Sequence, residues 1–275
     1  PSTRTDTLDL AVQGLKFPPR DLEQALGQQL TMLAAAREAL ERTGQVDPTR
    51  SGVFVGMGCD PEVARYGVRW RMQDWAPYWG EAEPGVVSTL EDAAVSHLES
   101  PGVLGTMPNV VANRLSSQFD FTGQGFTVSS EELSGVRALE LAMRALRSGD
   151  LDTALVGAVD MSCEAVHQSA LSQLGLPEDT GDGAIALVVE RLEEAQANGR
   201  TIYALIDDQG ELPAWQQSHE VLERTGKPHA ARGLIQVAAL ALCLGQRRAL
   251  GGTPWYGQTG AGLRVTALAG QASTL

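Results

Sequence analysis

The sequence predicts an α/β protein in which short buried strands alternate with amphipathic helices. The 275 residues are 43% hydrophobic but only 5% aromatic and include 30 glycines, which suits a core packed from alanine, valine and leucine. Apolar runs at residues 51–58 and 152–160 indicate buried strands, and segments with apolar residues at helical spacing lie between such runs. A chain of this length is also able to bury a substantial core.

Charge and cysteine spacing exclude several kinds of partner and site. The net charge of −13 argues against binding to nucleic acids or anionic membranes, which need clustered lysine and arginine. Cys59, Cys163 and Cys243 lie far apart without metal-type spacing, so we expect no metal site. The glycine turn that ends the run at 51–58 has neither a G-K-[ST] nor a G-x-G-x-x-G motif, and we expect no cofactor.

The chain shows neither a signal peptide nor a long apolar segment. Because no apolar run approaches the roughly 18 residues of a membrane-spanning helix, we expect no membrane insertion and a cytoplasmic location. The sequence opens at Pro1 without a methionine, which indicates either a segment of a longer polypeptide or a processed terminus.

In chain order, the first predicted element is a helix from Asp21 to Arg42. Its leucines share one stripe, alanines fill the space between them, and Gly44 is a suitable C-cap. The segment from Arg65 to Trp79 is rich in aromatic residues, which we expect to cover a core or a subunit interface. A lipid-facing or ligand-facing patch is the alternative. A loop from Pro101 to Arg114 is then expected to lead into a helix.

The stretch from Phe119 to Asp150 contains a sharp turn between a strand and a helix. Phe126 to Ser129 is short, apolar and β-branched, whereas Val136 to Leu146 carries apolar residues at helical spacing. The turn between them, Ser129 to Gly135, is polar. Such a turn lifts the residue at the bend above the sheet and directs the first free N–H groups of the helix toward it. Enzymes use this elbow to display a nucleophile.

The elements after the elbow continue the alternation. A strand buried on both faces is expected at Asp152 to Asp160, and a glycine turn with a strand follows at Gly181 to Glu190. Residues 191–200 predict a polar helix, and Thr201 to Ile206 predict a further strand. The segment from Gly262 to Leu268 has the pattern of a last strand.

Six segments around the elbow form one ordered pattern. They are Asn113–Ser116, Phe119–Gly123, Phe126–Val128, Arg137–Leu139, Leu146–Asp150 and Ala154–Val159. In this order they resemble the β-ketoacyl synthase family, above all the ketosynthase-like domains of polyunsaturated fatty acid synthases and iterative type I polyketide synthases. The resemblance implies a thiolase-like layered α-β-α-β-α fold and membership of an acyltransferase-class family. The first half of that fold is expected to be complete and the second half truncated.

The resemblance also identifies the positions at which a ketosynthase carries its catalytic residues. Active members hold an acyl-accepting cysteine in the elbow, within a T-V-D-T-A-C-S-S-S-type run, and a gapless count from Thr127 places Glu132 there. No H-G-T-G-T run for the first family histidine exists, and a gapless alignment on Gly226 and Gly233 places Lys227 at the second histidine. Claisen condensation needs the thiolate and both histidines. We therefore expect no catalytic residues.

A degenerate pocket is expected in place of the active site. Three interpretations of Glu132 stay open: a capping acid at a helix N-terminus, an ion pair with Lys227 across the former pocket, or a general base. The ion pair predicts that substitutions of the two residues have non-additive effects on stability. The possible pocket residues are Ser130, Glu131, Glu132, Leu133, Lys227 and His229.

The family pattern is continuous to Ile206 and breaks after Asp207. We therefore interpret residues 1–206 as the ketosynthase-like N-terminal half. Residues 207–275 are interpreted as a remnant of the C-terminal half, packed in the same domain, because a complete ketosynthase has a second half of similar size.

Two classes of function follow from this resemblance. The first is a non-catalytic, truncated ketosynthase-like domain that acts as a structural, dimerisation or chain-length-factor-like part of a polyunsaturated fatty acid or polyketide megasynthase. The alternative is a small enzyme that uses Glu132 as a general base on acyl thioesters, such as a malonyl decarboxylase, dehydratase or hydrolase.

The resemblance also implies partners. The family pairs the strand that enters the elbow, here Gln124 to Ser129, with its mate across a two-fold axis, so we expect a homodimer. Other domains of the same megasynthase are expected partners: an acyltransferase, an active ketosynthase or an acyl carrier protein.

Overall fold

Four strands form one mixed sheet in the order β2-β1-β3-β4. β1 is parallel to both of its neighbours, and β4 is antiparallel to β3. The strands are β1 (Ser51–Gly56), β2 (Gly125–Val128), β3 (Thr153–Met161) and β4 (Asp182–Glu190). The computed structural model describes residues 3–60, 63–80, 83–176, 179–207, 226–245, 256–258 and 264–266.

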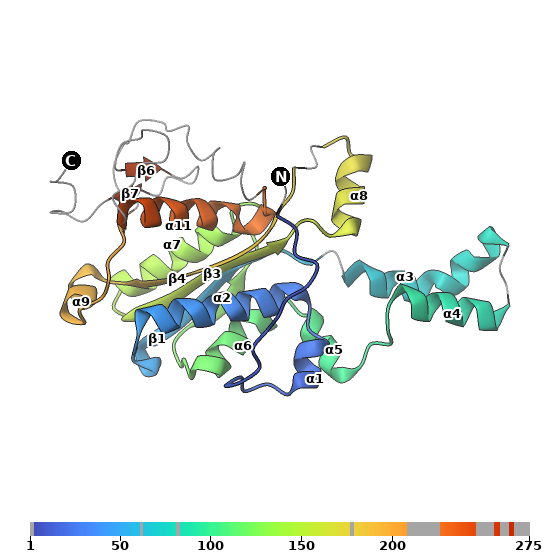
Figure 1. The fold of residues 1–275 in the computed structure, drawn as a ribbon, viewed down its shortest axis with the longest axis horizontal. Coiled ribbons are helices and arrows are strands. Elements are labelled where there is room, and N and C mark those ends of the chain that lie inside the picture. Colours follow the sequence, from blue (N-terminus) through green and yellow to red (C-terminus); the bar gives the residue numbers. More distant parts are fainter. Residues whose placement is uncertain are drawn as a thin grey trace.

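Helices cover both faces of this sheet (Figure 1). α2 and α6 pack on one face, and α7 and α11 pack on the other. The α-helices are α1 (Pro19–Glu23), α2 (Gly27–Thr43), α3 (Ala64–Trp75), α4 (Pro84–Ala94), α5 (Ser100–Thr106), α6 (Val110–Phe119), α7 (Ser134–Arg147), α8 (Ala165–Gln173), α9 (Leu192–Ala197) and α11 (Arg232–Gly245). The described residues also form the 3-10 helices η1 (Pro48–Arg50), η3 (Ala76–Trp79) and η4 (His229–Ala231).

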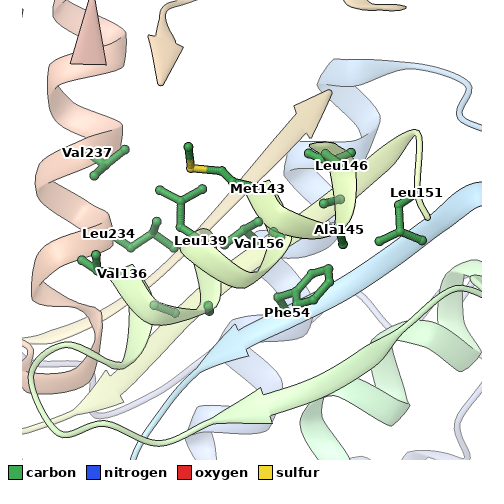
Figure 2. Packing of buried hydrophobic residues seen from close by; sticks show 14 of the residues in the cluster. Phe54, Val136, Leu139, Met143, Ala145, Leu146, Leu151, Val156, Leu234 and Val237 are labelled. Carbon is green, nitrogen blue, oxygen red and sulfur yellow. The ribbon is translucent and has the colours of Figure 1, made fainter. Parts of the chain in front are cut away.

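Alternation along β1 divides the core between the two faces of the sheet. Phe54 packs toward α7, whereas Val53 and Val55 pack toward α2, and all three are fully buried. Figure 2 shows α7 between the sheet and α11, with Leu139 and Leu234 among the side chains that fill the space between the helices. Each such buried side chain contributes about 1.5–3 kcal/mol relative to an exposed one. The strand at 152–160, predicted as buried on both faces, is confirmed as β3.

α7 begins so close to the end of β1 that two glycines are needed where they meet. A Cβ on Gly56 would lie 2.3 Å from the backbone nitrogen of Gly135, and one on Gly135 would lie 2.7 Å from the Cβ of Ala158. The close backbone contact of Gly56 with Gly135 fixes the position of the first turn of α7. The elbow that precedes α7 is thereby held at the carboxyl ends of β1 and β2.

The N-terminal helix differs from the prediction. The sequence predicts one helix from Asp21 to Arg42, but the chain forms α1 and α2, which are separated at an extended Leu26 (ψ 150°). The Leu26 N–H donates to the carbonyl of Gly105 at 3.1 Å, and the amide of buried Gln29 donates to the same carbonyl at 2.8 Å. Hydrogen bonds to a distant segment therefore interrupt the helix.

For Pro101 to Arg114 the sequence predicts a loop that leads into a helix; the helix is confirmed as α6, but a loop in the first part is wrong. α5 occupies its first part, and α6 begins at Val110. Pro101 lies in the first turn of α5, where the missing N–H of proline has no helical partner to lose. The proline that suggested a loop therefore begins a helix.

α3 and α4 form a hairpin that projects from the rest of the chain (Figure 1). They pack on each other around Met72 and Val87, and Arg69 forms an ion pair with Asp92. The aromatic residues predicted to cover a core or an interface are here, but Trp70, Tyr78 and Trp79 are all exposed. They do not cover a core of this chain, and a subunit interface stays a prediction.

Three short strands form a second sheet in the order β5-β7-β6. They are β5 (Leu205–Asp207), β6 (Tyr256–Gln258) and β7 (Arg264–Thr266), and both pairs are antiparallel. β5 is much shorter than the predicted strand at 201–206, whereas β7 lies within the predicted strand at 262–268. No helix among the described residues has both the length and the apolar character to cross a bilayer.

Candidate functional site

The elbow between β2 and α7 contains a strained residue. Glu131 adopts a left-handed backbone conformation with φ +49°, which is uncommon for a residue with a side chain. Ser134 holds the bend, because its hydroxyl accepts from the Ser130 N–H at 2.9 Å and donates to the Glu131 carbonyl at 2.6 Å. The predicted turn from strand to helix is present, although α7 begins at Ser134 rather than at Val136.

Glu132 lies on the surface of the elbow. Its side chain is 59% exposed, and its nearest charged partner is Arg232 at the start of α11, with Nη1 and Oε2 3.5 Å apart. Lys227 instead forms an ion pair with Asp179, on the segment that precedes β4. The predicted ion pair between Glu132 and Lys227 is therefore wrong, because each residue has a different partner.

His229 brings the first turn of η4 to the elbow. Its Nε2 lies 3.2 Å from the Oε2 of Glu131, and the side chains are 41% and 88% exposed. The ring of His167, from α8, has its centroid 6.5 Å from the ring of His229. Of the six expected pocket residues, the structure therefore joins Glu131 with His229, places Glu132 beside them, and directs Lys227 elsewhere.

Buried polar residues at the end of β3 hold this arrangement. Ser162 donates to the carboxylate of Asp160 at 2.6 Å and accepts from the His229 N–H at 3.1 Å. Asp160 also accepts from the Ala230 N–H at 3.2 Å. Neither residue is among those predicted from the sequence. The sequence feature that could have indicated them is a pair of polar residues at the carboxyl end of an otherwise apolar strand.

None of the three cysteines belongs to the elbow segment Ser129 to Gly135. Cys163 follows β3 and is buried, with its Sγ 3.3 Å from the Thr3 carbonyl and 3.7 Å from the Thr180 hydroxyl. Burial raises the pKa of this thiol, which lowers its fraction of reactive thiolate. Cys163 is a core residue in the turn that follows β3. Cys59 is exposed and Cys243 is half-buried in α11.

The described sheet, its two helical layers and its strand-to-helix elbow define a layered α/β protein of the thiolase-like class. Within that class the chain belongs to the β-ketoacyl synthase family. The family described as "Beta-ketoacyl synthase, N-terminal domain" matches residues 5–195. The resemblance inferred from the elbow motifs is thereby confirmed.

Curated relatives come from polyketide and fatty acid synthases. The chain is 31% identical over 210 residues to the spectinabilin polyketide synthase system protein NorA' of Streptomyces orinoci, covering 68% of this chain and 5% of that protein. It is 26% identical over 222 residues to a polyunsaturated fatty acid synthase polypeptide of a Thraustochytrium species, covering 74% and 10%. The chain thus spans a small part of these relatives.

Two solved structures share the fold. The PfaC ketosynthase–chain length factor superposes with a TM-score of 0.76 at 20% identity, covering 97% of this chain and 36% of that one. A chain from the complex of a type II polyketide acyl carrier protein with its ketosynthase superposes with a TM-score of 0.64 at 14% identity, covering 97% and 89%. These likenesses confirm the predicted thiolase-like α/β fold.

Proposed function

We propose that this chain is a non-catalytic ketosynthase-like domain, a structural, dimerisation or chain-length-factor-like part of a polyunsaturated fatty acid or polyketide megasynthase. The observation that carries the proposal is the chemistry of the elbow. By the gapless count from Thr127, Glu132 takes the position of the acyl-accepting cysteine, and its side chain is exposed beside Arg232. A carboxylate there cannot form the thioester that condensation requires, and the buried Cys163 is not a substitute.

Mass spectrometry tests this proposal. The chain is incubated with acetyl-CoA and malonyl-CoA, and separately with an acylated carrier protein, and its intact mass is measured. We expect no covalent adduct. The variant Glu132→Cys is the matched control, because it restores a thiol at the elbow and reports whether the assay detects acylation there. A stoichiometric acyl adduct on the unchanged chain would overturn the proposal.

A second candidate function is the hydrolysis, dehydration or decarboxylation of an acyl thioester. It is supported by the contact between His229 and Glu131, since a histidine oriented by a carboxylate is a common general base. The base would then be His229 with Glu131, rather than Glu132 as the sequence suggested. The test is release of thiol from acyl-CoA or of carbon dioxide from malonyl-CoA, which His229→Gln and Glu131→Gln should abolish and Glu132→Gln should leave unchanged.

The proposal includes a homodimer built on β2. This strand lies at an edge of the sheet, and residues 121–130 around it carry no charge, although charged side chains usually protect such an edge. Phe126 on β2 is 40% exposed. Antiparallel pairing with β2 of a second copy would cover the uncharged edge of β2 and the exposed side chain of Phe126. We expect a dimer by light scattering at micromolar concentration and a monomer for Phe126→Lys; a monomeric unchanged chain contradicts this part of the proposal.

We also propose that residues 1–206 correspond to the N-terminal half of a ketosynthase and residues 207–275 to a remnant of the second half. The end of the family match at residue 195 supports the boundary. The packing of α11 on α7 supports a shared domain, because Leu234 and Val237 join the same cluster as Leu139.

A further inference from the structure

β4 forms the edge of the sheet opposite to β2, and no strand among the described residues pairs with its outer side. At its first residue, Asp182, the N–H donates to the carbonyl of Thr3 at 2.8 Å, and the carbonyl accepts from the Thr3 hydroxyl at 3.2 Å. Asp182 therefore directs its backbone groups away from β3. Because this direction alternates along an antiparallel strand, Ala184, Ala186 and Val188 direct theirs the same way.

These three residues have no hydrogen-bond partner on the outer side of β4 within the part of the chain that the structure describes. Buried or half-buried backbone N–H and C=O groups are normally paired, and an unpaired one is costly away from water. All nine residues of β4 are partly buried. The edge therefore presents a regular row of backbone donors and acceptors in a sheltered position.

Elements above and below the sheet extend beyond this edge and form a groove. Ala184, Ala186 and Val188 pack toward α2, whereas Ile185 and Leu187 pack toward α7 and α11, and Figure 1 shows α2 and α11 on opposite sides of the sheet. A cavity of about 520 Å³ runs along β4 between them. Its lining also includes the apolar residues Ala35, Ala39, Leu205, Ile206, Ala238 and Leu242 and the charged residues Glu38, Arg42, Arg147, Glu190, Arg191 and Arg200.

We propose that this groove binds an extended, uncharged polypeptide strand, which pairs with β4 as a fifth strand of the sheet. The row of unpaired backbone groups selects a peptide, because only another backbone supplies donors and acceptors at the same spacing. The covered faces select apolar side chains on both sides of the occupant. Gly183 to Val189 carry no charge, and among the charged lining residues Glu38 pairs with Arg42 and Glu190 with Arg200. The backbone carbonyl of Thr3 already accepts a hydrogen bond from this edge, at the N–H of Asp182.

An acyl chain is the competing occupant, since the cavity lies in the size range of small-ligand pockets. It would fill the apolar volume but leave the backbone groups of Ala184, Ala186 and Val188 unpaired. The desolvation of those groups would then oppose binding. The two occupants are therefore distinguished by whether these three amides become hydrogen-bonded.

Amide hydrogen exchange on the whole chain tests the proposal. The probe is a short acetylated peptide of alternating valine and alanine with terminal lysines for solubility, and its control is the same peptide methylated on alternate backbone nitrogens. The unmodified peptide should slow exchange at Ala184, Ala186 and Val188. The methylated peptide should bind at least about tenfold more weakly, because it loses several hydrogen bonds.

Ala186→Pro provides a matched test in the protein. The substitution removes an N–H that faces the groove and keeps the ladder with β3, a setting in which strands tolerate proline. It should weaken peptide binding at least about tenfold, whereas Ala186→Ser, which keeps the N–H, should bind as the unchanged chain does. If the proline variant does not fold, the comparison of the two peptides decides. Equal affinity for both peptides, or binding of palmitate but not of the peptide, would overturn the proposal.

Discussion

Substituting Arg200 by methionine tests the ion pair that connects the end of β4 to the end of α2. Arg200 lies 3.2 Å from Glu190, with side chains 15% and 5% exposed, and it donates to the carbonyls of Thr43 at 2.9 Å and Gln45 at 2.7 Å. Without the arginine, the Glu190 carboxylate keeps only the Thr153 hydroxyl, 3.2 Å away. Leaving such a buried charge unpaired costs about 3–5 kcal/mol, against a total stability of roughly 5–15 kcal/mol for a domain.

The assay is urea unfolding at neutral pH, followed by far-ultraviolet circular dichroism. Adding Glu190→Gln to Arg200→Met should recover much of the loss, because the unpaired charge is then gone. The control is Arg42→Met in α2. Arg42 pairs with Glu38, and the two side chains are 68% and 64% exposed. Loss of this exposed ion pair should lower the free energy of unfolding by less than about 1 kcal/mol. If Arg200→Met costs no more than this control, the reasoning from burial is refuted.

Three further predictions concern the elbow, the sheet and pH. In a double-mutant cycle of Glu132→Gln and Lys227→Met, the effects on unfolding free energy should add within roughly 0.5 kcal/mol, because the residues have separate partners; a larger coupling would show that they touch. Gly56→Ala should lower the free energy of unfolding by about 1–3 kcal/mol and so lower the urea midpoint, since its Cβ would lie 2.3 Å from the backbone of α7; an unchanged midpoint would contradict the tight contact. Two arginines lower the pKa of Asp152 from 3.8 to about 2, so its contribution is present above pH 4 and lost as the pH falls toward 2. Solvent screening of this half-exposed carboxylate limits that contribution to about 1 kcal/mol. The stability difference between the unchanged chain and Asp152→Asn should therefore shrink across that range, and a constant difference would argue against it.

Strands and helices with strong local patterns could be predicted from the sequence. The run at 152–160 is apolar on both faces, and the structure forms β3 at Thr153–Met161. The elbow is similarly legible, because a β-branched run, a polar turn and a helical pattern follow one another within a few residues. Fold class follows from these elements, since their order leaves few alternatives for a layered α/β protein.

Features that depend on distant contacts could not be predicted. The break between α1 and α2 is stabilised by hydrogen bonds to Gly105, and its local signal is a single glycine, Gly27, inside an otherwise helical pattern. The prediction that Glu132 pairs with Lys227 was wrong for a related reason. An alignment gives the position of a residue along the chain, but the geometry of η4 decides that His229 and Arg232, rather than Lys227, reach the elbow.

The hairpin of α3 and α4 has a consequence for how the chain unfolds. Its helices pack mainly on each other around Met72, with a small cluster separate from the two that flank the sheet. A segment with few contacts to the rest opens at a lower free energy than the global transition, as an independent cooperative unit. Its amides should exchange with solvent well before those of β1 and β3. Substitutions at Trp70 or Tyr78 should therefore leave the exchange rates of the elbow amides unchanged.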